Sequence, residues 1–286
     1  MTALADAQVT VIGLGLMGGS LAGALRGQCR AVVGVDRDGA TVETALARGV
    51  VDRGTTDLAE GVAEADVVIL ATPVRVILDL LDTMGPLLPE GCLLMDLGST
   101  KTEILARMDL LPETVQPLGG HPMCGKETSG IDAADPALYH GQPFILSPLT
   151  RTSASALGLG RAVVEAVSAR PLLLSPEQHD RVVAAISHLP YLLACGLVGA
   201  AEDVAARDAL VWLVAASGFR DTSRLAASDV TMMLDILMTN HEAIAVALEA
   251  FDARLHRMTQ LIAEGNEAEL RVALRAVRAR RKELFA

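Results

Sequence analysis

Three glycines near the N-terminus have the spacing of a phosphate-binding turn. Gly13, Gly15 and Gly18 form a GxGxxG pattern that directly follows the apolar run 9–12 and opens a helical pattern. In this context the glycines allow a tight turn and a close approach of backbone to pyrophosphate, and the helix N-terminus offers unpaired N–H groups to the phosphates. The motif predicts a dinucleotide site formed by Gly13, Leu14, Gly15, Leu16, Met17 and Gly18.

An acidic residue after the next apolar run indicates which dinucleotide binds. Asp36 ends the run 31–35, where its carboxylate can accept hydrogen bonds from both ribose hydroxyls and would repel a 2′-phosphate. This favours NAD over NADP, although Arg37 partly offsets the charge, and the glycines alone do not exclude FAD. Thr72 and Pro73, which follow the run 67–71, are assigned to the same cofactor site.

Two histidines are candidates for chemistry beside such a cofactor. His121 lies in a Gly-Gly-His-Pro segment that we expect to be a loop after a strand at 116–118. A neutral imidazole with a pKa near 6.5 suits proton abstraction from a hydroxyl that loses hydride, but a histidine there could also merely satisfy backbone groups. His188 lies just before Pro190, which should interrupt its apolar helix; it could equally be a hydrogen-bonded core histidine.

The elements that would position these residues follow a regular alternation. Apolar runs predict strands at 9–12, 31–35, 67–71, 93–96, 116–118 and 144–146, and helical patterns lie between them at 16–25, 40–47, 74–84 and 102–108. Such alternation is typical of βαβ units, and therefore predicts an α/β fold with a Rossmann-type, doubly wound parallel sheet. After Ser175 the sequence predicts helices only, starting with a capping box of Ser175, Pro176 and Gln178. We expect a dinucleotide-binding domain over 1–174 and an all-helical substrate and dimerisation domain over 175–286.

Composition excludes several classes of function. The net charge is −11 with a pI near 5.0, whereas nucleic-acid binding requires a concentrated basic surface. The arginines near the C-terminus are instead interpreted as cations favoured at a helix end. The four cysteines have no metal-type spacing, which predicts free thiols, no metal site and a cytoplasmic location. The N-terminus lacks the features of a signal peptide.

One segment is long and apolar enough to raise the question of a membrane. Residues 182–201 carry no acidic or basic charge other than His188. However, the flanks lack the positive cluster that would orient a membrane helix, and a buried core or dimer helix has the same composition. We therefore expect no membrane insertion.

Five segments together resemble the prephenate/arogenate dehydrogenase family. They are 12–21 (IGLGLMGGSL), 96–101 (DLGSTK), 119–127 (GGHPMCGKE), 187–190 (SHLP) and 218–224 (GFRDTSR), in the family's order. The resemblance implies a Rossmann domain joined to a helical domain that pairs two chains into a homodimer. It also implies NAD-dependent oxidation of the ring hydroxyl of prephenate or arogenate, with loss of the ring carboxylate.

The resemblance also assigns roles to individual residues. His121 matches the catalytic histidine and Ser99 the serine that hydrogen-bonds the same hydroxyl, while His188 matches a second histidine that helps to place substrate and nicotinamide. Arg224 matches the arginine that binds a substrate carboxylate, a role that suits the two-pronged guanidinium. Arg220 is a secondary candidate for the substrate, unless it pairs with Asp221.

Some positions depart from the family's pattern. Many members have Pro at the position of Val230 and Trp at that of Met233, and that Trp lies near the substrate side chain. The stretch 219–224 reads closer to arogenate-using members, whereas the NAD signal and the generic motifs favour prephenate. We predict prephenate as substrate, with arogenate, or both, as the alternative. Cys124 could suggest a thiol nucleophile beside His121, but such a thiol needs an electropositive setting.

Two rival functions account for part of these features. A dehydrogenase of the 3-hydroxyisobutyrate type, or another hydroxyacid or imine reductase, would share both domains, but these enzymes normally depend on a helix-borne lysine, and no lysine lies between Lys126 and Lys282. An NAD-sensing binding module would explain the glycines and a dimer. It would leave Ser99, His121 and Arg224 without a role.

Overall fold

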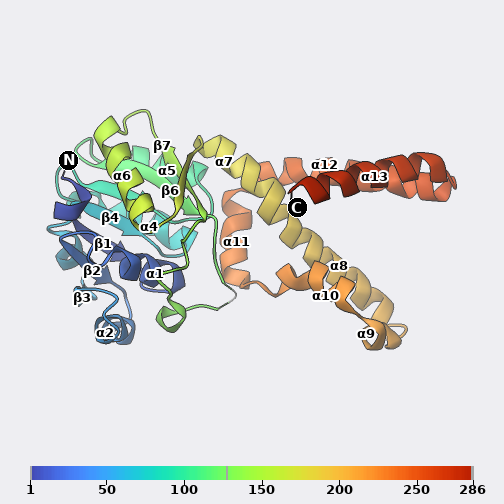
Figure 1. Ribbon diagram of the computed structural model, residues 1–286, viewed down its shortest axis with the longest axis horizontal. Coiled ribbons are helices and arrows are strands. Elements are labelled where there is room, and N and C mark those ends of the chain that lie inside the picture. The colour runs from blue at the N-terminus through green and yellow to red at the C-terminus, as the bar shows by residue number, and fades with distance from the viewer. Residues whose placement is uncertain (1, 127, 285–286) are drawn as a thin grey trace.

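The computed structural model describes residues 2–126 and 128–284 and contains one eight-stranded sheet in its N-terminal part (Figure 1). The strand order is β3-β2-β1-β4-β5-β6-β7-β8, and every neighbouring pair is parallel except β6 and β7. The strands are β1 (Gln8–Ile12), β2 (Ala31–Val35), β3 (Arg53–Thr55), β4 (Val67–Leu70), β5 (Leu93–Asp96), β6 (Gln116–Pro122), β7 (Pro143–Pro148) and β8 (Arg170–Leu173). The predicted doubly wound sheet is confirmed.

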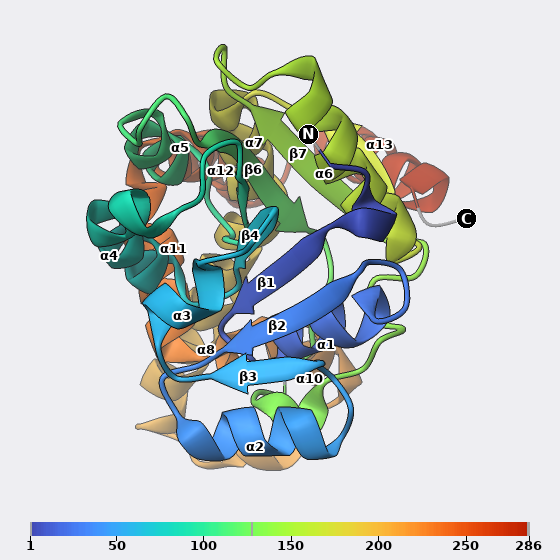
Figure 2. The same cartoon turned by 90° about the vertical axis from the view of Figure 1, so that its left-hand side faces the viewer.

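Helices cover both faces of this sheet, as Figure 2 shows with α1 and α6 on one side and α4 and α5 on the other. The helices of this part are α1 (Leu16–Leu25), α2 (Gly39–Ala47), α3 (Leu58–Val62), α4 (Val74–Met84), α5 (Thr102–Asp109) and α6 (Ala154–Ala166). Short 3-10 turns are η1 (Leu4–Asp6), η2 (Gly85–Leu87) and η3 (Ile131–Ala133). All of the helices expected between the strands are present.

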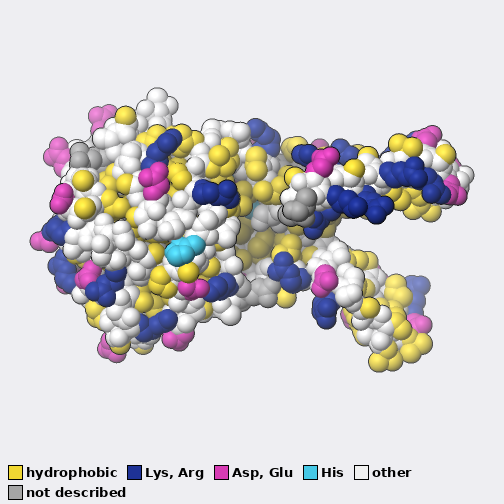
Figure 3. All heavy atoms as spheres, viewed as in Figure 1, with side chains coloured by type: hydrophobic (Ala, Val, Ile, Leu, Met, Phe, Trp, Pro, Cys, Tyr) yellow, Lys and Arg dark blue, Asp and Glu magenta, His cyan; other side chains and the backbone are white. Residues whose placement is uncertain are grey.

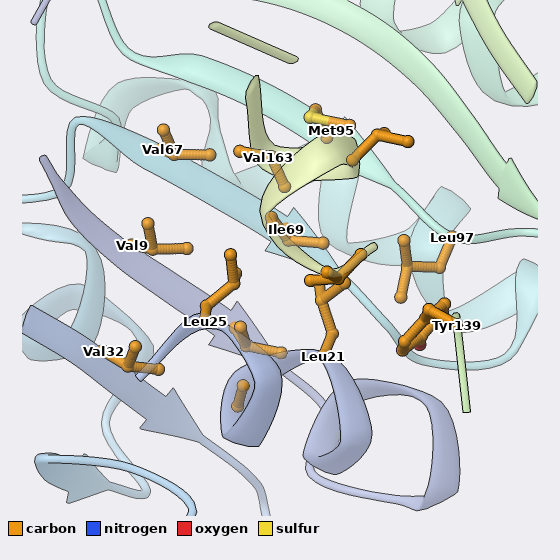
Figure 4. Close-up of a cluster of buried hydrophobic side chains, with 14 of the residues drawn as sticks. Val9, Leu21, Leu25, Val32, Val67, Ile69, Met95, Leu97, Tyr139 and Val163 are labelled. Atoms are coloured by element: carbon orange, nitrogen blue, oxygen red, sulfur yellow. The ribbon is translucent and has the colours of Figure 1, made fainter. Parts of the chain in front are cut away.

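Side-chain alternation along the strands divides the core into two clusters. Val9 and Val11 face α1 and α6 with Leu21 and Val163, as Figure 4 shows for part of this cluster. On the other face, residues such as Leu70 pack with α4 and α5. Strands buried on both faces read as continuous apolar runs, and this is why they were predictable from Val, Leu and Ala without aromatic residues.

The strand β6 is longer than predicted, and the expectation of a loop around His121 is wrong. Gly119, Gly120 and His121 pair with Ser147, Leu146 and Ile145 of the antiparallel strand β7. A Cβ atom on Gly120 would lie 2.4 Å from the carbonyl oxygen of Asp96, so this glycine permits close strand packing rather than a turn.

The chain after Ser175 is helical throughout the described residues. It contains α7 (Pro176–Val183), the π-helical turn η4 (Ala184–His188), α8 (Leu189–Ala205), α9 (Leu210–Val214), α10 (Ser217–Ser223), the 3-10 turn η5 (Arg224–Ala227), α11 (Val230–Thr239), α12 (His241–Ala263) and α13 (Glu267–Leu284). The Ser175 hydroxyl accepts a hydrogen bond from the Gln178 N–H, as the capping sequence predicts. The predicted interruption at Pro190 takes the form of the π-helical turn η4. Proline has no backbone N–H to donate to the preceding turn, and a wider turn tolerates this missing hydrogen bond.

The helices after α7 form two projecting arms, one of α8, α9 and α10 and the other of α12 and α13 (Figure 1). Helix α11 lies between the arms and the sheet, where it packs on α4. Asp235 on α11 accepts the Arg75 N–H of α4 at 3.2 Å and pairs with the Arg75 guanidinium at 3.4 Å. One turn further on, Thr239 hydrogen-bonds Thr100 at the start of α5. The helical part is thus fixed to the carboxyl edge of the sheet, where both α4 and α5 begin.

Candidate active site

The glycine loop has the shape that a dinucleotide requires. Gly13 has a φ of +93°, which a side chain would strain, and a Cβ on Gly18 would lie 1.8 Å from the Gly13 carbonyl oxygen. A Cβ on Gly15, by contrast, meets no atom within 4 Å. Gly15 is the N-cap residue of α1 and provides no side-chain cap, so the open space beside it lies at the N-terminal N–H groups of the helix. Leu16 and Met17 form the first turn of this helix, and Leu14 lies in the buried core.

The remaining predicted cofactor residues surround this loop. One carboxylate oxygen of Asp36 accepts the Leu14 N–H at 2.8 Å, which fixes Asp36 beside the loop, and Arg37 next to it is exposed. Thr72 follows β4, and a Cβ on Gly13 would meet its methyl group at 2.8 Å. Its buried hydroxyl has no hydrogen-bond partner among the described residues, and Pro73 precedes α4. An open Gly15, an acidic side chain beside the loop and an unsatisfied hydroxyl together fit a bound dinucleotide.

His121 forms part of a linear chain of three side chains. Its Nδ1 lies 2.7 Å from Nε2 of His179, and Nδ1 of His179 lies 2.7 Å from Oδ1 of Asp180. His121 comes from β6, whereas His179 and Asp180 come from α7 of the helical part. Burial, and then the neighbouring His179, hold the pKa of His121 well below 6.5, so its imidazole is neutral at neutral pH.

The Asp180 carboxylate also joins the two parts of the chain. It accepts the backbone N–H groups of Lys101 at 2.7 Å and Thr102 at 2.8 Å, which are the N-cap residue and the first residue of helix α5. Burial acts to raise the pKa of Asp180, but the hydrogen bonds from His179, Thr102 and Lys101 outweigh it and leave the pKa below its usual value. Asp180 is therefore ionised at neutral pH, and it caps a helix of the other domain.

His188 belongs to the same cluster. It ends η4, it is 1% exposed, and its Nδ1 lies 3.2 Å from Nδ2 of Asn240, which donates to the Asp180 carbonyl. Burial lowers the pKa of His188 to about 4. His188 is also one of the neighbours that lower the pKa of His121. The structure thus places His121 and His188 in one buried cluster. Their roles in catalysis stay predictions.

Ser99 and a buried ion pair occupy the turn after β5. Ser99 is half-buried, two residues before Lys101, whose Nζ contacts the Asp96 carboxylate. Lys101 and Asp96 have fully buried side chains, and Asp96 also accepts the N–H of Gly120, the neighbour of His121. This pair fixes the Ser99 turn against the strand that carries His121.

The predicted substrate arginines lie on exposed segments of the helical part. Arg224 begins η5, which packs on α8, the helix that follows His188. Arg220 lies on α10 and its guanidinium pairs with the Asp221 carboxylate at 3.5 Å, which is the alternative interaction expected for it. The roles of both arginines in binding substrate stay predictions.

The geometry does not support the alternative of a reactive thiol at Cys124. Cys124 packs against the core, and burial raises its pKa to about 11, so it is a thiol rather than a thiolate at neutral pH. All four cysteines are free. The part of the chain that the structure describes contains no group of three or more His, Cys, Asp or Glu residues placed to hold a metal ion.

His179, Asp180 and Asn240 of this cluster were not predicted from the sequence. His179 and Asp180 directly follow the capping sequence at the start of α7. Their position at the predicted domain junction was the only feature of the sequence that pointed to a function. Nothing in the local pattern indicates that this first turn faces β6, because the contact joins segments far apart in the chain.

Comparison with known proteins identifies the family. A family model described as "Prephenate dehydrogenase, nucleotide-binding domain" matches residues 21–173, and one described as "Prephenate dehydrogenase, dimerization domain" matches residues 175–276. Prephenate dehydrogenase of Bacillus subtilis is 34% identical over 257 residues, which cover 88% of this chain and 68% of the relative.

Two solved structures have the same arrangement of both domains. The crystal structure of prephenate dehydrogenase from A. aeolicus in complex with hydroxyphenyl propionate and NAD+ matches with a TM-score of 0.92 at 31% identity, covering 99% of this chain and 100% of that one. Synechocystis arogenate dehydrogenase matches with a TM-score of 0.84 at 31% identity, covering 97% and 99%. The glycine loop, the histidine cluster at the domain junction and these matches lead to one conclusion: the chain belongs to the prephenate dehydrogenase family.

Proposed function

We propose that this protein is an NAD-dependent prephenate dehydrogenase, which converts prephenate to 4-hydroxyphenylpyruvate and carbon dioxide in tyrosine biosynthesis. The observation that carries the proposal is the match of both domains to this family, together with a neutral His121 beside the carboxyl edge of the sheet. Ligands of open α/β sheets bind at this edge. The NAD preference rests on Asp36 next to the glycine loop, and A. aeolicus prephenate dehydrogenase has been crystallised with NAD+.

The proposed roles of the side chains follow from the chemistry. NAD held by the glycine loop and Asp36 would supply the acceptor for the hydride of the ring carbon that carries the hydroxyl. His121 takes the hydroxyl proton, Ser99 hydrogen-bonds the same oxygen, and His188 helps to place substrate and nicotinamide. Loss of the ring carboxylate as carbon dioxide leaves its electron pair in the ring, which becomes aromatic. Arg224 binds a carboxylate of the substrate, and Arg220 is the second candidate for that role.

The choice between prephenate and arogenate depends on the substrate side chain. The two acids differ in a pyruvyl or an alanyl group, and so in one charged amine. The stretch 219–224 favours arogenate, and a relative of Zymomonas mobilis is named cyclohexadienyl dehydrogenase. The decisive experiment is steady-state kinetics on prephenate and arogenate with NAD and with NADP. We expect the highest kcat/KM with prephenate and NAD; turnover of neither acid would refute the proposed function.

We further propose a cytoplasmic homodimer, with domains at 1–174 and 175–286. The helix from Pro176 to Ala205 is apolar enough to cross a membrane, yet only 22% of its most apolar window is buried within one chain. Apolar side chains also lie exposed along both arms, and Figure 3 shows them as hydrophobic patches. They include Leu197, Val204, Val246, Ile262, Val272 and Val277. A second copy that covers these arms fits the description of the C-terminal match as a dimerisation domain.

The molar mass in solution tests the dimer. Light scattering coupled to size exclusion should give twice the mass of the 29.9 kDa chain. Replacing Val246 and Ile262 by Glu should shift the protein toward the monomer. A monomeric parent at micromolar concentration would refute this part of the proposal.

A further inference from the structure

The three-residue chain that ends at His121 fixes where its proton lies. Asp180 is ionised and can only accept, so the proton between it and His179 belongs to Nδ1 of His179. His179 is neutral because burial lowers its pKa, and its Nε2 is then an acceptor. Nδ1 of His121 must therefore carry the proton that this acceptor receives. The remaining nitrogen of His121, Nε2, holds a lone pair.

We propose that His179 and Asp180 are positioning residues that hold His121 in the tautomer able to act as a base. This inference rests on the proposed function and deepens it. As His121 gains the substrate proton on Nε2, its Nδ1–H donates to His179 more strongly, and the Asp180 carboxylate stabilises the positive charge at the end of the chain. The arrangement extends the His–Asp pair of a catalytic triad by one imidazole.

The same carboxylate makes this base dependent on domain docking. The Asp180 carboxylate accepts a hydrogen bond from Nδ1 of His179. It also caps α5 by accepting the N–H groups of Lys101 and Thr102, which belong to the nucleotide domain. If the helical domain separated from the sheet, the hydrogen bond between His179 and His121 and the cap on α5 would be lost at the same time. His121 is thus supported as a base only when the two domains enclose the site.

The competing explanation is that His179 and Asp180 only stabilise the domain junction. Under that explanation, variants that keep the fold also keep the rate of the chemical step. Under the proposal, the rate depends on which nitrogen of His121 carries the proton, even in variants whose stability is unchanged. Asp180→Asn distinguishes the two. Its amide oxygen can still accept the Thr102 N–H of α5, while its NH2 group replaces the oxygen that faces His179 and the Lys101 N–H.

Asp180→Asn should exchange donor and acceptor in both hydrogen bonds that link residue 180, His179 and His121. Its NH2 group donates to Nδ1 of His179, so Nε2 of His179 then carries the proton and donates to Nδ1 of His121. His121 is left with its proton on Nε2 and cannot act as base. We expect kcat with prephenate to fall by about 10³–10⁴-fold, the scale of the wrong tautomer in a catalytic triad, with little change in the Kd of NAD. The matched control is Asp229→Asn, which changes another helix-capping aspartate, at α11.

A second pair of variants tests His179 itself. His179→Gln keeps an acceptor for the His121 proton and should retain much more kcat than His179→Leu, which keeps none. The control histidine is His241→Gln, exposed at the start of α12. Equal kcat in parent and His179→Leu, with melting temperatures also equal, would overturn the proposal.

Histidine tautomers can be read without any turnover. Nitrogen-15 NMR of the histidine-labelled, full-length protein with NAD should show His121 protonated at Nδ1 in the parent and at Nε2 in Asp180→Asn. Protonation at Nε2 in the parent would refute the proposal even if the enzyme oxidises prephenate. Conversely, a parent that turns over neither acid but shows the Nδ1 tautomer would refute the proposed function and leave the positioning chain intact.

Discussion

Replacing Lys101 by Met removes the positive partner of a carboxylate that has no contact with solvent. Both side chains of the Lys101–Asp96 pair are 0% exposed. Breaking a buried ion pair on one side costs about 3–5 kcal/mol, because the remaining charge stays uncompensated. Asp96 keeps backbone hydrogen bonds from Gly98 at 2.7 Å and Gly120 at 3.2 Å. We therefore expect the lower end, about 3 kcal/mol, which corresponds to a fall of roughly 6–12 °C in Tm.

The pH dependence of this loss is a further part of the prediction. Burial raises the pKa of Asp96, and the loss of Lys101, which lowers that pKa, raises it further. In the folded variant Asp96 thus stays protonated up to a higher pH than it does in the unfolded chain. A group with a raised folded pKa stabilises the fold at low pH, and this stabilisation disappears as pH rises through that pKa. The deficit of Lys101→Met relative to the parent should thus be smaller at pH 5 than at pH 7.

Differential scanning calorimetry measures both effects. Lys126→Met is the matched control, because its ion pair with Asp135 is exposed, and its Tm should equal that of the parent. The double variant Lys101→Met/Asp96→Asn removes both charges and should recover most of the loss. A Tm for Lys101→Met equal to that of Lys126→Met at pH 7, or a double variant no more stable than the single one, would refute the reasoning.

Three further predictions concern the site. His121→Asn should lower kcat by about 10²–10⁴-fold with the Kd of NAD nearly unchanged, the scale for losing a positioned base; equal turnover would remove His121 from the mechanism. Arg224→Ala should raise the KM for prephenate about 10–100-fold, since a charge-assisted contact to carboxylate is worth roughly 1.5–3 kcal/mol; an unchanged KM would direct attention to Arg220. Asp36→Ala should improve kcat/KM with NADP relative to NAD, and a parent that already prefers NADP would contradict the cofactor assignment.

The pH profile of the parent follows from the same pKa shift. The pKa of His121 lies well below 6.5 because of burial and His179. A base with a lowered pKa stays unprotonated as the solution is acidified, so kcat/KM should not fall between pH 8 and 6.5 through this group.

The sequence predicted those parts of the fold that depend on local patterns. Strands buried on both faces, such as β1 and β4, are continuous apolar runs, and the glycine loop follows one of them. The strands β3 and β8 at the two edges of the sheet were not predicted, because Arg53–Thr55 and Arg170–Leu173 are short and partly exposed. Edge strands need a neighbour rather than an apolar run, and the neighbour is set by tertiary structure.

The candidate site shows the same division. Ser99, His121 and His188 were found because they occur in segments that resemble a known family. His179 and Asp180 were missed because their function depends on a contact between α7 and β6, which no local spacing encodes. Likewise, Gly119 and Gly120 were interpreted as a loop, whereas the antiparallel partner β7 makes them part of a strand. Only the assembled fold shows that the two domains share one chain of hydrogen bonds.

The products formed from prephenate by the purified protein with NAD test the central claim most directly. The account predicts equal amounts of NADH, carbon dioxide and 4-hydroxyphenylpyruvate from the parent, and almost none from His121→Asn at the same concentration. If neither prephenate nor arogenate yields NADH above the enzyme-free control, or if His121→Asn forms the same products at the parent's rate, the account is contradicted.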